Sequence, residues 1–165
     1  MTLAVSAWRS SSSWNISRSL FFPFCGAVRR RWRDRLVEQR DVVVIGGGQA
    51  GLATGYYLRR TPLNFEILDA GTAPGGAWRH TWNSLHLFSP ARWSSLPGWI
   101  MPGGADTYPP RDDAIRYITE YEERYKLPVR RPVRVTRVRR VYDRLLLETN
   151  AGDWEAKAVV SATGT

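Results

Sequence analysis

The sequence predicts an α/β fold in which helices cover a mainly parallel sheet that also carries a small antiparallel β meander. A short β-branched run, Asp41–Ile45, passes directly into a glycine-rich turn and a helical segment, which is typical of a strand–helix–strand unit. A long helical segment and several alternating segments follow as far as Ala162. With 165 residues, of which 43% are hydrophobic, the chain has the size and apolar content of about one domain.

The first forty residues differ in composition from the rest. They contain a serine run (Ser10–Ser13), a nine-residue apolar stretch (Leu20–Val28) and a basic cluster (Arg29–Arg35). The apolar stretch is far shorter than the roughly 20 residues of a membrane span, and the basic cluster follows it, whereas in a signal peptide it would precede it. No helical or strand period is sustained, so we interpret residues 1–40 as a disordered or non-native extension. An organellar transit peptide is the alternative, because the segment is rich in Arg and Ser and poor in acids.

The distribution of charge argues against a nucleic-acid partner. Residues 1–40 hold eight arginines and two acidic residues, whereas residues 41–165 hold 16 basic and 13 acidic residues, so the net charge of +9 lies mostly in the leading segment. A nucleic-acid-binding protein needs basic residues gathered on a folded face or in a recognised module. We find neither and expect no nucleic-acid partner and no membrane span.

Cysteine and histidine usage predicts neither a disulfide nor a metal site. Cys25 is the only cysteine, which rules out an intrachain disulfide and suits a cytoplasmic location. His80 and His86 lie six residues apart without a cysteine or carboxylate cluster beside them, so we expect no metal. We interpret His86, in a loop rich in aromatic residues, as a packing or surface histidine.

The glycine-rich turn predicts a dinucleotide site. Gly46, Gly48 and Gly51 satisfy the frame G-x-G-x-x-G. The first glycine permits the tight turn, the second lets a pyrophosphate approach the backbone, and the third lets helix and strand pack closely. The helix is expected to continue to about Arg60, with its free N–H groups facing the phosphates. This pattern indicates a Rossmann-like unit with expected cofactor contacts at Gly46, Gly48, Gln49, Ala50 and Gly51.

The second strand, expected at Phe65–Asp69, ends on an acidic residue. We expect Asp69 to accept hydrogen bonds from the adenosine ribose, with Ala70 beside it, and Glu66 to point elsewhere. An acid at this place disfavours the 2′-phosphate of NADP, so the site should hold FAD or NAD. A P-loop is excluded, because Leu52 and Ala53 stand where Lys and Ser or Thr would follow the last glycine.

A G-G-x-W motif follows this acid at Gly75, Gly76 and Trp78. Here the sequence resembles the flavin-containing monooxygenase superfamily, which includes Baeyer–Villiger-type and related bacterial FAD monooxygenases. The resemblance covers about residues 41–165, and its further segments are Trp82–Pro97, Tyr108–Pro109, Asp112–Tyr125, Pro128–Val135 and Ala162–Gly164.

The resemblance implies that the bound nucleotide is FAD, with the G-G-x-W motif along its ribityl and pyrophosphate groups. It also implies that backbone near Val135 meets the adenine and that Ala162 belongs to the site. A flat isoalloxazine ring needs apolar, aromatic walls, and four tryptophans fall within 22 residues. Of these we expect only Trp78 to touch the cofactor, while the others anchor a long loop: Trp82, Trp93 and Trp99.

The C-terminal half is expected to supply one helix and four strands. Asp112–Tyr125 has acids at its start and apolar residues at helical spacing, namely Ala114, Ile115, Ile118, Tyr121 and Tyr125. Its later acids, Glu120, Glu122 and Glu123, are interpreted as a solvated face. The expected strands, with a turn at Asn150–Asp153, are Pro128–Val138, Val141–Thr149, Trp154–Ala156 and Ala158–Ala162.

In full-length relatives a second Rossmann domain, which binds NADPH, follows the A-T-G element that Ala162–Gly164 resembles. We therefore expect residues 41–165 to be an incomplete FAD-binding domain whose NADPH domain is missing, and a separate chain could supply that domain. In the complete enzyme, the resemblance implies, NADPH reduces the flavin, O₂ adds at C4a, and the (hydro)peroxyflavin oxygenates a small organic substrate.

No catalytic residue is identified, because neither a G-x-S-x-G motif nor a carboxylate pair is present. Two alternatives stay open. The chain could belong to a flavin reductase or oxidase of the two-dinucleotide fold that never oxygenates a substrate. It could also be a non-catalytic remnant that binds FAD weakly or not at all.

Overall fold

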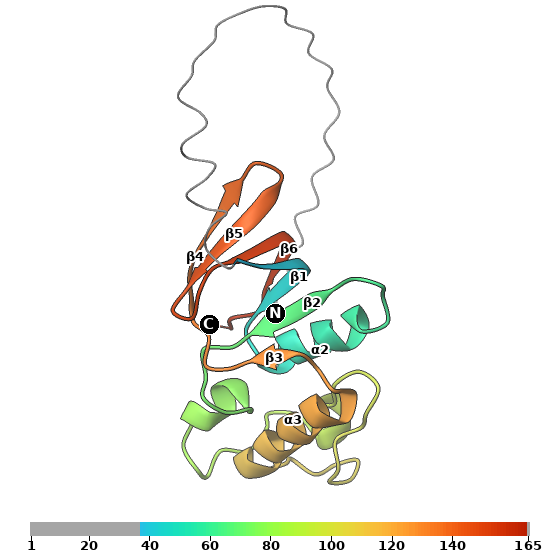
Figure 1. Cartoon of the computed structure of the whole chain (residues 1–165). Helices are drawn as coiled ribbons and strands as arrows, with labels where there is room; N and C mark the ends of the chain where they lie inside the picture. The colour runs from blue at the N-terminus through green and yellow to red at the C-terminus, as the bar shows by residue number, and fades with distance from the viewer. Residues whose placement is uncertain (1–36, 165) are drawn as a thin grey trace, which may run out of the picture. The chain divides into compact units, whose positions relative to one another are not determined.

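The computed structural model describes residues 37–164 (Figure 1). The chain divides into two units, Met1–Leu36 and Val37–Thr165, and only the second is described. Most of the expected N-terminal extension at residues 1–40, including its serine run, apolar stretch and basic cluster, lies outside the described residues. Its last part does not, because Glu38–Arg40 form the beginning of the first strand.

The described residues form one six-stranded sheet with the strand order β3-β2-β1-β6-β5-β4 (Figure 1). Strands β1, β2, β3 and β6 are mutually parallel, whereas β4 and β5 add an antiparallel meander beside β6. The predicted α/β fold with a parallel sheet and a small meander is therefore confirmed. The strands are β1 (Glu38–Ile45), β2 (Phe65–Leu68), β3 (Val129–Arg130), β4 (Val135–Val141), β5 (Arg144–Thr149) and β6 (Trp154–Ser161).

Strand β1 is buried on both faces, as its β-branched run predicts. Val42 and Val44 face the larger core, with helices α2 (Gln49–Leu58) and α3 (Arg111–Tyr125). Val43 faces a second core on the other side, which includes Leu147 of the meander and Trp154 of β6. Successive side chains of a strand point to opposite faces, so this one strand contributes to both cores.

Helix α3 buries Ala114, Tyr117, Ile118 and Tyr121, so Tyr117 joins the expected apolar face while Ile115 is only half-buried. Two of these tyrosines anchor the preceding loop. The hydroxyl of Tyr117 donates to the carbonyl of Trp99 at 2.5 Å, and that of Tyr121 donates to Pro97 at 2.6 Å. The loop also contains two short 3-10 helices, η1 (Gly76–His80) and η2 (Ala91–Trp93).

Two expectations about the strands were wrong. The segment Pro128–Val138 is not one strand but two, because β3 pairs with β2 at one edge of the sheet while β4 pairs with β5 at the opposite edge. The chain has to leave the sheet between them, at residues 131–134, where the Arg131–Pro132 peptide is cis. Conversely, the two short strands expected after Asn150 are a single strand, β6, which pairs with β1 over most of its length.

Candidate functional site

The glycine-rich turn lies at the carboxyl ends of the parallel strands. The backbone N–H of Gly46 donates to Leu68 at the end of β2, and that of Ala162 donates to Ile45 at the end of β1, both at 2.8 Å. Helix α2 begins directly after Gly48, and no side chain caps its N-terminus. The first N–H groups of a helix have no partner within it, so backbone donors are available where anions are commonly bound.

Two glycines of the turn are required by the fold itself. Gly46 has a positive φ of 108°, and a Cβ there would lie 2.4 Å from the carbonyl oxygen of Ala162. At Gly51, in the first turn of α2, a Cβ would lie 1.8 Å from the carbonyl oxygen of Gly46. The predicted tight turn and close helix packing are both present, and the carbonyl of Ala162 lies against the turn at Gly46.

Gly48 is different, because a Cβ there would meet no protein atom within 4 Å. Its φ of −83° is open to any residue. From the other side, Gly76 approaches so closely that a Cβ on it would lie 2.9 Å from the Cα of Gly48. The fold therefore does not require glycine at position 48. A ligand that passes close to the backbone at this position would require it.

Asp69 follows β2 immediately and lies against the glycine-rich turn. A Cβ on Gly47 would be 2.7 Å from the Oδ2 atom of Asp69. The Oδ1 atom accepts a hydrogen bond of 3.3 Å from the backbone N–H of Gly71. The adjacent Ala70 is exposed. The carboxylate is thus beside the turn, where the sequence predicts a ribose-binding acid.

Glu66 has another task, as expected. Its carboxylate is buried and accepts hydrogen bonds from the Nε atoms of Arg40 at 3.0 Å and Arg130 at 2.7 Å. These contacts join β1, β2 and β3 on one face of the sheet. Glu66 therefore stabilises the sheet, and Asp69 is the acid at the turn.

The G-G-x-W motif is brought to the start of α2. Gly75 and Gly76 have positive φ angles of 120° and 54°, which favour glycine. The indole N–H of Trp78 donates to the side-chain oxygen of Gln49 at 3.3 Å, so η1 is tied to the first residue of α2. Ala50 follows Gln49 in the same turn.

The other tryptophans of the loop lie differently. Trp82 and Trp93 are exposed, whereas the ring of Trp99 packs on Tyr117 with a centroid distance of 4.9 Å. This contact supports the anchoring role expected for Trp99. The exposure of Trp82 and Trp93 argues against the same role for them.

Val135, expected near the adenine, is the first residue of β4 and packs against the second core. The segment before it contacts the candidate site directly, because the N–H of Val133 donates to the carbonyl of Asp69 at 2.8 Å. Val135 thus lies two residues beyond a direct backbone contact with Asp69.

The sequence reasoning missed Arg131 and was wrong about Glu122. Arg131 Nε donates to Asp69 Oδ2 at 2.6 Å, and its two terminal nitrogens donate to the two oxygens of Glu122 at 2.6 and 2.8 Å. Glu122 is therefore paired and largely buried, not solvated. No local pattern marks this pair, because the chain folds back between α3 and β4 to bring the two side chains together.

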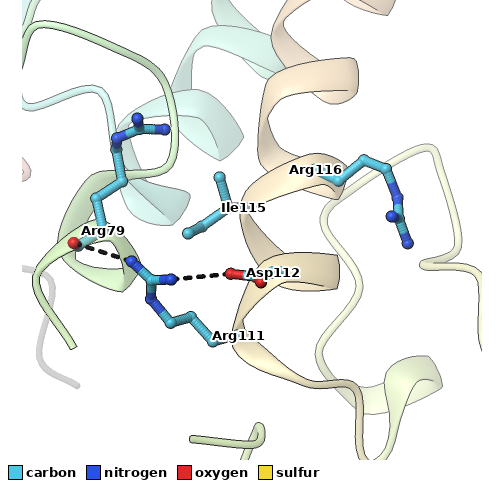
Figure 2. Close-up of a pocket in the computed structure, with 5 residues that line it drawn as sticks. All are labelled: Arg79, Arg111, Asp112, Ile115 and Arg116. Atoms are coloured by element: carbon cyan, nitrogen blue, oxygen red, sulfur yellow. Dashed lines mark hydrogen bonds and ion pairs between the residues drawn. The ribbon is translucent and has the colours of Figure 1, made fainter. Parts of the chain in front are cut away.

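A cavity of about 360 Å³ lies between η1 and the start of α3, lined by Arg79, Arg111, Asp112, Ile115 and Arg116 (Figure 2). Arg111 donates to the carbonyls of Trp78 at 2.9 Å and Arg79 at 3.2 Å, and it pairs with Asp112 at 2.9 Å. Arg116 is paired with Asp113. Arg111 thus fastens the G-G-x-W segment to α3.

His86 is exposed, and its Nδ1 atom lies 3.1 Å from the carbonyl of Ser84. In the part of the chain that the structure describes, no three His, Cys, Asp or Glu side chains are grouped as metal ligands would be. None of the helices between residues 37 and 164 combines the length and hydropathy needed to cross a bilayer.

Known proteins resemble this chain over the same region. A CzcO-like uncharacterized oxidoreductase of Geobacillus kaustophilus is 38% identical over 124 residues, which are 75% of this chain and 36% of that protein. The structure of a flavin-containing monooxygenase from Stenotrophomonas maltophilia matches with a TM-score of 0.75 and 55% identity, over 78% of this chain and 39% of that one. An open crystal structure of cyclohexanone monooxygenase shares the fold, with a TM-score of 0.70 and 21% identity. The matched region covers 78% of this chain and 27% of the cyclohexanone monooxygenase chain.

The chain thus spans less than two fifths of the length of these relatives. The expected resemblance to flavin-containing monooxygenases is confirmed. Residues 43–165 match the sequence family described as pyridine nucleotide-disulphide oxidoreductase. The chain belongs to this family, among flavin monooxygenases and related oxidoreductases.

Proposed function

We propose that residues 41–165 are the FAD-binding part of an NADPH-dependent flavin monooxygenase that oxygenates a small organic substrate. The observation that carries the proposal is the open space at Gly48, at the uncapped start of α2, between Asp69 on one side and the G-G-x-W motif on the other. The 55% identity with a flavin-containing monooxygenase supports it.

The residues fit an FAD molecule. The backbone N–H groups of Gly48 and of the first two residues of α2, Gln49 and Ala50, would bind the pyrophosphate, since helix N-termini favour anions. Asp69 would accept hydrogen bonds from the adenosine ribose, which also disfavours a 2′-phosphate at this position. The remaining contacts would come from Gly46, Gly51, Ala70, Gly75, Gly76, Trp78, Val135 and Ala162.

The chemistry of the complete enzyme would belong to the cofactor. Bound FAD would supply the redox chemistry by which O₂ oxygenates the substrate, with NADPH as the reductant. The residues of this chain would bind and orient the cofactor. We assign no proton transfer to them. A cytoplasmic location is part of the same proposal.

A disulfide reductase is the competing activity that the family description raises. The 55% identity with a flavin-containing monooxygenase favours the monooxygenase, while a non-oxygenating oxidase is distinguished by its product. Measuring oxygenated product against hydrogen peroxide release, with the complete enzyme and NADPH, separates the two.

The cofactor claim is tested by titrating the purified 165-residue chain and its Gly48→Val variant with FAD and following flavin fluorescence. We expect saturable binding by the wild type. We expect at least a tenfold weaker affinity in the variant, because a β-branched side chain would occupy the space left for the pyrophosphate. The matched control is Ala151→Val, which adds bulk at the exposed turn before β6 and should leave binding unchanged.

Three results decide the question. A wild-type chain that takes up no FAD would remove the proposed function. Undiminished binding by a folded Gly48→Val variant would show that FAD, if bound, lies elsewhere. Equal losses in Gly48→Val and Ala151→Val would point to a general effect on folding.

A further inference from the structure

Three side chains from separate parts of the chain form a compact ionic cluster beside the glycine-rich turn. We call Asp69, Glu122 and Arg131 the acid–arginine cluster. Asp69 follows β2, and Glu122 lies on α3. Arg131 lies in residues 131–134, the segment that connects β3 to β4 and that we call the crossing. The guanidinium donates three hydrogen bonds of 2.6, 2.6 and 2.8 Å, one to Asp69 and two to Glu122.

The cluster is fixed by its geometry and by its burial. The side chains of Arg131, Asp69 and Glu122 are only 10%, 13% and 16% exposed. Burial by itself would lower the pKa of Arg131, but the hydrogen bonds to Glu122 and Asp69 outweigh it and raise the pKa. The guanidinium is therefore a permanent cation. Its bidentate pairing with Glu122 fixes its plane, as a single contact would not.

The guanidinium also lies against the turn. A Cβ on Gly47 would be 2.7 Å from the Nη2 atom of Arg131, the same distance as from Asp69 Oδ2. The backbone on both sides of Arg131 is tied to Asp69: the N–H of Asp69 donates to Arg130 at 3.0 Å, and the N–H of Val133 donates to Asp69 at 2.8 Å. The main chain of Asp69 is thus held by β3 and the crossing, whereas its carboxylate is held by Arg131.

We propose that Arg131, itself held by Glu122, is a positioning residue for the ribose-binding carboxylate of the cofactor site. This inference rests on the proposed function. An ionised carboxylate offers about four acceptor positions. Arg131 and the N–H of Gly71 use one each, on different oxygens. About two acceptor positions remain, enough for the two hydroxyls of a ribose, and the contact with Arg131 keeps the carboxylate from rotating.

A purely structural role makes a different prediction. If the cluster served only to join α3 to the sheet, its loss would weaken binding of every flavin dinucleotide equally. If it orients Asp69, its loss would weaken only the recognition of the ribose hydroxyls. The informative quantity is therefore the ratio of two dissociation constants, for an FAD analogue with a 2′,3′-dideoxyadenosine moiety and for FAD.

The test compares this ratio between the wild-type 165-residue chain and a double variant, Arg131→Met with Glu122→Leu. Removing Arg131 alone would leave two buried carboxylates without their ionic partner, whereas the double variant leaves only Asp69, which keeps the hydrogen bond from the N–H of Gly71. Hydrogen bonds to a charged group predict a ratio of about tenfold to a hundredfold in the wild type. We expect the ratio to fall to about threefold or less in the double variant, with the affinity for the analogue nearly unchanged.

The matched control removes another arginine–glutamate pair. Arg139 and Glu148 are 2.9 Å apart on β4 and β5, at the opposite edge of the sheet from β3. The double variant Arg139→Met with Glu148→Leu should keep the wild-type ratio. Should the first double variant fail to fold, Glu122→Gln replaces it. That change keeps an acceptor but removes the charge that fixes Arg131, and it should lower the ratio about threefold.

The outcomes are distinct. A wild-type ratio in a folded Arg131→Met, Glu122→Leu variant, or in Glu122→Gln, would overturn the inference while leaving FAD binding intact. Equal loss of affinity for both ligands would also overturn it and assign the cluster to folding. A wild-type chain that binds both ligands equally would remove Asp69 as the ribose acceptor. A wild-type chain that binds neither would overturn the proposed function itself.

Discussion

Replacing Gly51 by alanine should destabilise the protein although alanine is the better helix former. Gly51 lies in the first turn of α2, where Gly→Ala would ordinarily stabilise the helix by roughly 1 kcal/mol. Here the added Cβ would lie 1.8 Å from the carbonyl oxygen of Gly46. The obstructing atom belongs to the backbone, so no side-chain rotation can relieve the contact.

The size of the effect follows from the displacement required. Restoring a separation of about 3 Å moves α2 or the turn by more than 1 Å in a region where Leu52 is fully buried. Overpacking of this kind costs about 1–3 kcal/mol and sometimes more. The contact is with a backbone atom, so we take the upper end of this range, and after subtraction of the roughly 1 kcal/mol gained in helix propensity the free energy of unfolding should fall by about 2 kcal/mol. The melting temperature should fall by roughly 5 °C or more.

Urea unfolding of the full chain, followed by far-UV circular dichroism, measures the difference. Gly48→Ala is the matched control, because it makes the same chemical change three residues earlier, where a Cβ meets nothing within 4 Å. At an N-cap, alanine in place of glycine should change stability by no more than about 1 kcal/mol. If Gly51→Ala were as stable as Gly48→Ala, the close contact between α2 and the turn would not exist as described.

Two further predictions concern stability. Glu66→Gln should lower the free energy of unfolding by about 3 kcal/mol, because Glu66 is a buried carboxylate with two arginine partners. In the same urea assay, Asp106→Asn should cost under about 0.5 kcal/mol, because it breaks an exposed ion pair. Similar losses in the two variants would contradict the argument from burial. Burial raises the pKa of the phenols of Tyr117 and Tyr121 above their unfolded values. Their folded state therefore retains protons that the unfolded chain loses, so the contribution of these two phenols to stability should be constant below about pH 10 and fall above it. Urea midpoints at pH 8 and pH 10.5 measure this loss, which Tyr121→Phe should reduce; an unchanged loss in that variant would exclude Tyr121 as a cause.

Much of the candidate site could be predicted from local sequence. The strand, the turn and α2 are encoded within about twenty consecutive residues, and the spacing of Gly46, Gly48 and Gly51 has a steric meaning that does not depend on the rest of the chain. The position of Asp69 beside this turn was predictable, because the second strand of such a unit lies next to the first and ends at the same edge of the sheet. Helix α3 was located within one residue at its start, because its apolar spacing and its acidic first turn are local signals.

Contacts between distant segments could not be predicted in this way. The division of residues 128–138 into β3 and β4 depends on which edge of the sheet each half joins, and the sequence of the segment is compatible with one continuous strand. Glu122 reads as a solvated glutamate on an amphipathic helix, and nothing in its neighbours indicates a partner. The contact between the carbonyl of Ala162 and Gly46 could not be predicted either, because it forms only when β6 lies next to β1.

The amino-acid sequence by itself determined the α/β class, the glycine-rich turn and the acid beside it, because these depend on backbone sterics and on spacing within one supersecondary unit. Only the tertiary structure decided that residues 128–138 form two strands at opposite edges of the sheet. It also decided that the carboxylate of Asp69 is held by Arg131 and Glu122. These features depend on segments that meet only when the sheet is assembled, since a buried ion pair needs three-dimensional proximity and leaves no periodic pattern in the chain.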